Sequence, residues 1–150
     1  MIRYRFATQE DLNLLVELRL QFLEAKTNQR NFMDIFLNTR QFFEQKLADG
    51  NFQCILAYDD NKVIGEAFVY YESGIPTLFN LTGVSAYITN LYVNIKYRRN
   101  GIGAFLLQSL MQSIKEKQIH TVCANLTDQS EKLFEKFCFT KMDHMMLYQD

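Results

Sequence analysis

The stretch "YRRNGIGAFLL", residues 97–107, places two arginines and two glycines directly before a run with helical spacing. Glycines let backbone N–H groups converge without side-chain bulk, and the first amides of a helix lack partners within it. The positive end of the helix dipole also favours anions there. Arg98 and Arg99 could add charge-assisted hydrogen bonds to phosphate oxygens. The stretch therefore predicts a bound pyrophosphate.

A plainer interpretation is that the glycines only form a turn and the arginines are solvated, because short glycine motifs also occur by chance. Two common phosphate-binding motifs do not fit. A dinucleotide-binding loop needs a third glycine where this chain has Leu106, and a P-loop needs Gly-Lys followed by Ser or Thr, which the chain lacks. The predicted phosphate therefore belongs to another kind of ligand.

The composition indicates a globular protein. The chain has 150 residues, of which 48% are hydrophobic and 22% charged, so we expect one domain spanning residues 1–150. Its net charge of -1 provides no general attraction to nucleic acid or to anionic membranes, and we expect neither as a partner.

Cysteine usage and hydropathy bear on location. Cys54, Cys123 and Cys138 are widely spaced and form no CxxC pair, so neither a disulfide framework nor a metal site is expected. A reducing compartment suits free cysteines. No apolar run reaches the length that spans a membrane, and the first residues contain no apolar signal core. We therefore expect a cytoplasmic protein.

The hydrophobic periodicity alternates between helical and strand spacing, which predicts a mixed α/β layer fold. A short strand opens the chain, and Thr8 precedes the first helix as its N-cap. Gly50 is expected to end the second helix. The expected helices cover residues 9–25, 32–50, 103–114 and 129–137. The expected strands cover 2–7, two segments of 52–72 around the turn 59–61, 85–93, 119–125, and one or two segments of 139–149.

The motif Arg98-x-x-Gly101-x-Gly103, after "LYV" and before an apolar helix, resembles the acyl-CoA-binding motif of the GNAT superfamily of N-acetyltransferases. "KLFEKFCF", residues 132–139, is similar to the family's second signature, Leu-Tyr-x-x-x-Gly-Phe. The element order also resembles that fold over nearly the whole chain. The resemblance implies the order β-α-α-β-β-β-α-β-α-β-β, in which the fourth and fifth strands splay apart.

The resemblance implies acetyl-CoA as the cofactor. Backbone groups of the fourth strand would pair with the pantetheine arm as an added strand, and amides of the glycine loop would hold the pyrophosphate. A residue ending the fifth strand also commonly contacts the cofactor in the family. The expected cofactor-binding residues are Leu91, Tyr92, Val93, Arg98, Arg99, Asn100, Gly101, Ile102, Gly103, Ala104 and Asn125.

The sequence departs from the family at the residues that move protons. The tyrosine that often protonates the departing thiolate is Phe134, the following glycine is Cys138, and a glutamate base found in some members is replaced by Tyr87. Phenylalanine cannot donate a proton. Water near Tyr87, Asn90 or Tyr148 is then expected to take the proton of the amine, with a backbone amide around Val93 polarising the thioester carbonyl.

Plainer roles exist for these residues too. A strand tyrosine often serves in packing, and Asn90 could simply bond to backbone at a strand bulge. Several acidic residues could attract a cationic amine but are more commonly solvated: Glu24, Asp34, Glu66 and Glu72. Aromatic residues that could line an acceptor site are Phe32, Phe36, Phe42, Phe43, Tyr70 and Tyr71.

The expected function is transfer of an acetyl group from acetyl-CoA to a primary amine of a small molecule or peptide, with a homodimer as a possible assembly. An alternative is an acyl-CoA-binding protein of the same fold without turnover, which Phe134 and Tyr87 favour. A domain that retains only the fold for protein interactions is a third, and the intact loop from Arg98 to Gly103 argues against it.

Overall fold

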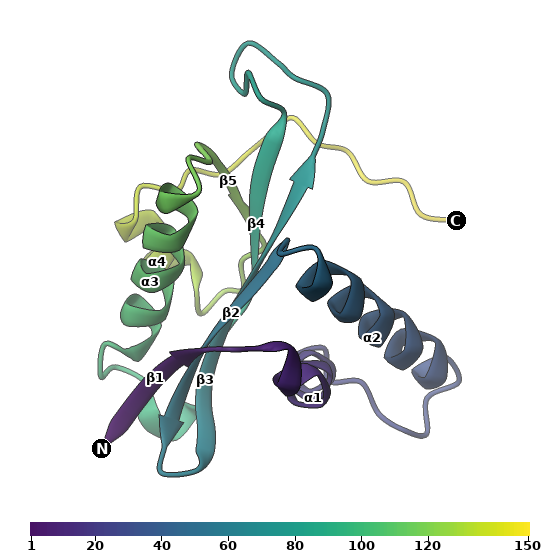
Figure 1. Ribbon diagram of the computed structural model, residues 1–150, viewed down its shortest axis with the longest axis vertical. Coiled ribbons are helices and arrows are strands. Elements are labelled where there is room, and N and C mark those ends of the chain that lie inside the picture. Colours follow the sequence, from purple (N-terminus) through teal and green to yellow (C-terminus); the bar gives the residue numbers. More distant parts are fainter.

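The computed structural model describes residues 1–150 as one five-stranded mixed sheet with helices on both faces (Figure 1). The strands follow the order β1-β2-β3-β4-β5, antiparallel up to β4, and β5 runs parallel to β4. The fold class expected from the sequence is confirmed. The elements are β1 (Ile2–Phe6), the 3-10 turn η1 (Gln9–Asp11), α1 (Leu12–Phe22), α2 (Phe32–Ala48), β2 (Phe52–Asp59), β3 (Lys62–Ser73), β4 (Val84–Val93), the 3-10 turn η2 (Ile95–Tyr97), α3 (Ile102–Glu116), β5 (Thr121–Ala124) and α4 (Glu131–Lys136).

Each face of the sheet has its own hydrophobic core. On one face, apolar residues of α3 at helical spacing pack with α4 against the sheet. On the other face, α1 and α2 pack against β2 and β3, where the Phe43 ring lies 4.8 Å from that of Phe52 and 5.6 Å from that of Phe68. Figure 1 shows the two helix pairs on opposite sides of the sheet. The loop between β4 and α3 lies at one end of this three-layer arrangement (Figure 1).

The strands expected within residues 139–149 do not form. No residue after α4 belongs to a strand, and the apolar side chains Met145, Met146 and Leu147 are exposed. A strand needs a paired neighbour, and strand propensity depends strongly on that context. The adjacent edge belongs to β5, which has only four residues. Figure 1 shows the C-terminal tail extending away from the sheet. The element order thus ends with β5 and α4.

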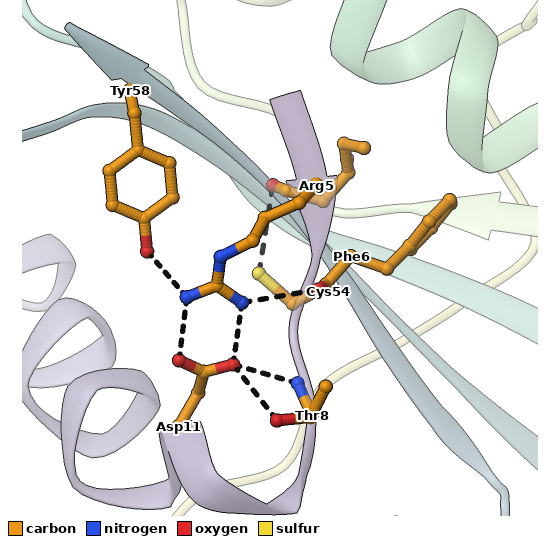
Figure 2. A network of polar contacts seen from close by, with 7 residues as sticks. Arg5, Phe6, Thr8, Asp11, Cys54 and Tyr58 are labelled. Carbon is orange, nitrogen blue, oxygen red and sulfur yellow. Dashed lines mark hydrogen bonds and ion pairs between the residues drawn. The ribbon is translucent and has the colours of Figure 1, made fainter. Parts of the chain in front are cut away.

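The first helical segment is fixed to the sheet by a salt bridge that the sequence analysis did not identify (Figure 2). Nη1 and Nη2 of Arg5 on β1 donate to Oδ2 and Oδ1 of Asp11, each at 2.8 Å. Nη2 also donates to the hydroxyl of Tyr58 on β2 (2.9 Å), and the N–H of Thr8 donates to Asp11 Oδ2 (2.7 Å). The hydrogen bonds from Arg5, supported by Thr8, lower the pKa of Asp11 from 3.8 to about 2.

The Asp11 network predicts a loss of stability in acid. Because the folded-state pKa is lowered, the carboxylate stabilises the fold above about pH 4, and this contribution disappears as the pH falls through 2. Asp11→Asn should reduce the free energy of unfolding at pH 7 by about 1–2 kcal/mol and flatten the acid limb of its pH profile. Urea unfolding across pH tests this, with Asp143→Asn in the exposed tail as control. An unchanged acid limb would contradict the assignment.

Candidate functional site

The loop between β4 and α3 presents a row of free backbone donors. The six amide N–H groups from Arg99 to Ala104 donate no hydrogen bond within the protein. Gly101 precedes the helix with φ +76°, and Arg99 has φ +64°, so the loop turns through the left-handed region twice. The loop leads into a 15-residue helix whose positive dipole end lies here. The arrangement has the donors and the field that an anion such as a phosphate requires.

The two arginines of the loop differ in their contacts with the rest of the protein. Arg98 Nε donates to the carbonyl of Val93 at 2.8 Å, and its guanidinium lies 5.8 Å from the centre of the Tyr92 ring. This bond fixes the loop to the end of β4 and leaves the terminal nitrogens of Arg98 free. Arg99 is exposed and makes no hydrogen bond or ion pair. Asn100 Nδ2 donates to the carbonyl of Tyr97 at 3.2 Å, which holds the loop itself.

The two glycines of the motif have different physical roles. A Cβ on Gly101 would meet no atom within 4 Å, so its requirement is the positive φ. A Cβ on Gly103 would lie 3.3 Å from Leu133 Cδ2 and 3.7 Å from Val93 Cγ2. Gly103 therefore allows α3 to pack closely against α4 and β4. Ile102 is buried in the core, so only its backbone amide is available to a ligand.

β4 loses its second neighbour halfway along its length. Its pairing with β5 runs from Ser85 to Ile88, and the N–H of Asn125 extends it by one bond to the Ile88 carbonyl (3.0 Å). Beyond Ile88, β4 pairs only with β3. β5 ends at Ala124, the partner of Ile88, so the region of β4 where the fourth and fifth strands were expected to separate has no second neighbour. The residues expected to bind the cofactor's arm, from Leu91 to Val93, lie on this part of β4, and Asn125 lies where β5 ends.

A β-bulge occurs just past the point where the strands separate. Asn90 has φ +56°, and the register with β3 shifts there. The Asn90 side chain is 0% exposed; its Oδ1 accepts from Arg19 Nη1 at 3.0 Å, and its Nδ2 donates to Glu66 Oε1 at 3.3 Å. The side chain thus links α1 to β3. These two side-chain bonds replace the backbone bond expected for Asn90 from the sequence.

Glu66 is a buried carboxyl group, contrary to the solvated charge expected from the sequence. It is 3% exposed, forms no salt bridge, and has Asn90 as its hydrogen-bond donor. Burial raises its pKa from 4.5 to about 8, against the opposing effect of the Asn90 bond. Its position inside the apolar run "VIGEAFV" was the available signal, because a central strand buries both of its faces.

The other expected proton-transfer residues lie in different surroundings. Tyr87 is half-buried on β4, and its ring stacks on Tyr70 of β3 with centroids 5.1 Å apart. Tyr148 lies in the tail and is 87% exposed. Phe134 is 2% exposed and packs against Phe139 in the core beside α3, with ring centroids 5.1 Å apart. Tyr87 and Asn90 thus lie three residues apart on β4, whereas Tyr148 lies in the exposed tail.

The aromatic residues considered for an acceptor site do not form one surface. Phe32 and Phe36 line a cavity of about 510 Å³ between α1 and α2. Phe43 is part of the core beneath α2, whereas Tyr71 belongs to the core on the opposite face of the sheet. Only Phe42, whose ring contacts Tyr70 edge-on at 5.4 Å, lies beside the aromatic pair on β3 and β4.

The structure has neither a cluster of metal-binding side chains nor a membrane-spanning helix. No group of three or more His, Cys, Asp or Glu side chains is arranged so that it could hold a metal ion. None of the helices combines the length and apolar character that crossing a membrane requires.

Comparisons with known proteins point in one direction. The family model described as "Acetyltransferase (GNAT) domain" matches residues 17–147. No curated protein matches the sequence. A predicted acetyltransferase from Clostridium acetobutylicum, solved with acetyl-CoA, is 28% identical, with a TM-score of 0.88 over 99% of this chain and 96% of that one.

Two more distant structures share the fold. A GCN5-related N-acetyltransferase from Ralstonia eutropha JMP134 is 20% identical, with a TM-score of 0.85 over 99% of both chains. AAC(6')-Iy, in complex with the bisubstrate analogue CoA-S-monomethyl-acetylneamine, is 15% identical, with a TM-score of 0.75 over 100% of this chain and 98% of that one.

Burial of Glu66 predicts that stability falls towards alkaline pH. With the pKa raised in the folded state, the protonated group costs nothing below about pH 4.5, and the penalty grows until the pH passes about 8. The free energy of unfolding should therefore fall by up to about 1.4 kcal/mol per pH unit in this window. Glu66→Gln, a neutral replacement of the same shape, should remove this slope.

Urea unfolding of the wild type and the Glu66→Gln variant between pH 5 and 8 measures the difference. Glu135→Gln, which neutralises an exposed carboxylate of α4, is the control and should retain the wild-type slope. Identical slopes in the wild type and Glu66→Gln would show that Glu66 is ionised in the folded protein.

Proposed function

Because the chain belongs to the GNAT acetyltransferase family, we propose that residues 1–150 form one catalytic domain that acetylates a primary amine of a small molecule or peptide. The acetyl donor is acetyl-CoA, and the amine attacks it directly in a ternary complex. The observation that carries this proposal is the row of six unused amides at the start of α3, beside the half of β4 that has no second neighbour.

In this proposal the cofactor occupies both features. Its pyrophosphate accepts hydrogen bonds from the amides between Arg99 and Ala104, with the side chains of Arg98 and Arg99 adding positive charge. Its pantetheine arm lies along β4 from Leu91 to Val93 as an added strand. Asn125, at the end of β5, borders the same space. The acetyl thioester then lies near the point where β4 and β5 separate.

Positioning supplies most of the rate in this proposal. The new C–N bond forms as the C–S bond breaks, the thiolate of coenzyme A leaves, and the amine gives up one proton. A thiolate is a much better leaving group than an amine, so the absence of an acid at Phe134 slows the reaction without preventing it. Holding the reactants together can lower the activation barrier by about 7–11 kcal/mol. Acid–base catalysis typically raises the rate by about 10²–10⁴-fold, which is a smaller effect. A backbone amide near Val93 polarises the carbonyl.

Water near Tyr87 and Asn90 accepts the proton of the amine in this proposal. Both residues lie on β4 around the separation point. Asn90 also contacts Glu66, but the pKa of about 8 leaves that carboxyl mostly protonated at neutral pH, so the water itself takes the proton there. Tyr148 stays a candidate from the sequence, and its exposed place in the tail adds no support.

A second candidate function is binding of an acyl-CoA without turnover. The observation that favours it is the burial of Phe134 in the core, where no proton donor replaces the tyrosine of the family signature. Both candidates require the same cofactor site and differ only in turnover.

Cofactor binding is tested by a pair of glycine variants. Gly101 and Gly50 both have positive φ, at +76° and +70°, and neither has an atom within 4 Å of an added Cβ. Gly101→Ala and Gly50→Ala should therefore destabilise the fold similarly, by about 1 kcal/mol. Only Gly101→Ala should weaken acetyl-CoA binding, by about 10- to 100-fold, because one or two amide–phosphate bonds lose alignment.

Calorimetric titration of acetyl-CoA into the wild type and both variants measures this. Equal affinity in all three proteins would place the phosphate elsewhere. No heat of binding in the wild type would remove the basis for both candidate functions.

Turnover is tested by release of free thiol from acetyl-CoA across a panel of primary amines. The enzyme is expected to release thiol only with an amine that becomes acetylated, whereas binding without release supports the second candidate. Tyr87→Phe, Asn90→Ala and Tyr148→Phe, each measured for kcat against pH, locate the group that controls proton removal. If all three changes are silent, the assignment of proton transfer to this part of β4 is wrong.

A further inference from the structure

Arg19 on α1 carries a positive charge that the protein does not balance. Its side chain is half-buried against β4, and Nη1 donates to Asn90 Oδ1 at 3.0 Å and to Thr89 Oγ1 at 3.4 Å. Both acceptors are neutral, and no carboxylate forms a salt bridge with the guanidinium. Arg5, by contrast, is paired with Asp11. The spacing of Arg19 within its helix already indicated a core-facing position.

The remaining donors of Arg19 form no hydrogen bond within the protein, and the guanidinium lies 5.8 Å from the centre of the Phe22 ring. Nε and Nη2 make no hydrogen bond to any protein atom, and partial burial lowers the pKa of the guanidinium. Glu66, on the other side of Asn90, is not the missing counter-charge. It forms no salt bridge, and its pKa of about 8 leaves it mostly protonated at neutral pH. A partly desolvated cation with free donors is therefore left for an external anion.

This cation lies where the acceptor would meet the thioester. Thr89 and Asn90, which Arg19 contacts, are the first residues of β4 beyond its last pair with β5. Tyr70 and Tyr87 stack nearby, with their rings tilted by 16° to each other, and the edge of Phe42 contacts Tyr70. Tyr70 is also close enough for its charge state to affect the pKa of Arg19. A charged anchor thus borders an aromatic surface.

We propose that Arg19 binds the carboxylate of the acceptor, and that the acceptor is therefore an amine that also carries a carboxylate, such as an amino acid. This inference rests on the proposed acetyl transfer. A planar guanidinium matches a carboxylate with two parallel hydrogen bonds. In an α-amino acid, one carbon separates the carboxylate carbon from the amine nitrogen, so an anchor at Thr89 and Asn90 holds the amine next to the separation point. The stacked tyrosines favour an apolar or aromatic side chain on the acceptor.

The test compares matched pairs of amines that differ in the carboxylate. L-phenylalanine and L-phenylalanine amide, and L-leucine and L-leucine amide, are assayed for kcat/KM with the wild type and with Arg19→Gln. The ratio of acid to amide should fall about tenfold or more in Arg19→Gln, mainly through KM, because a charge-assisted pair is lost. Arg19→Lys should retain part of the ratio. Arg3→Gln removes the same charge on β1 and should leave the ratio unchanged.

Unfolding temperature and acetyl-CoA affinity show whether Arg19→Gln is intact. An intact variant with an unchanged ratio, or with equal losses for acid and amide, overturns the proposal. If no amine is acetylated, the proposed catalysis fails separately, and calorimetric titration of L-phenylalanine into the protein saturated with coenzyme A decides the inference. Binding that Arg19→Gln abolishes supports it, and the absence of binding to the wild type overturns it.

Discussion

β4 has a neighbouring strand on both sides along only half of its length, and the arrangement of the candidate site depends on this. The parallel pairing with β5 stops at Ile88, and a bulge at Asn90 follows at once. From there the chain continues through η2 into the loop of free amides that begins α3. Backbone donors and acceptors on this part of β4 have no strand as partner and are left to water or to a ligand. In the proposed function, the edge of β4 and the amides of the loop bind one extended cofactor.

The same bulge also determines the polar contacts on the face of the sheet that α1 covers. A positive φ at Asn90 turns its side chain inward, where it joins Arg19 of α1 to Glu66 of β3. Three elements far apart in sequence thus share one buried polar contact. Its two ionisable members differ in how they respond to burial. Glu66 can become neutral by retaining a proton, whereas a guanidinium stays charged and needs hydrogen-bond acceptors or an anion. The polar centre beneath α1 therefore combines a neutral acid with an uncompensated cation.

The fold and the glycine loop before α3 followed from local sequence signals, since periodicity, turn glycines and helix starts act over a few residues. Gly101 and the start of α3 lie where the motif placed them, and Gly50 closes α2 through a bond from Asn51 N–H to the Lys46 carbonyl at 2.8 Å. Two of the contacts that escaped prediction join distant segments: Arg5 meets Tyr58, and Glu66 meets Asn90, only after the sheet has formed. Arg5 and Asp11 are only six residues apart, but no periodicity or turn signal marks their pairing. The strands expected within residues 139–149 do not form, because an alternating pattern alone does not provide a neighbouring strand to pair with.

Close packing at Gly103 gives α4 an influence out of proportion to its six residues. A Cβ added at Gly103 would lie 3.3 Å from Leu133 Cδ2, and Phe134 is buried in the adjoining core. Packing of α4 against Gly103 therefore fixes the orientation of the first turn of α3 and of its amide groups. Enlarging or trimming a side chain on the inner side of α4 would rotate those donors without touching any ligand. Weakened cofactor affinity in such a variant would result from misaligned amide donors. It would not mean that α4 itself contacts the cofactor.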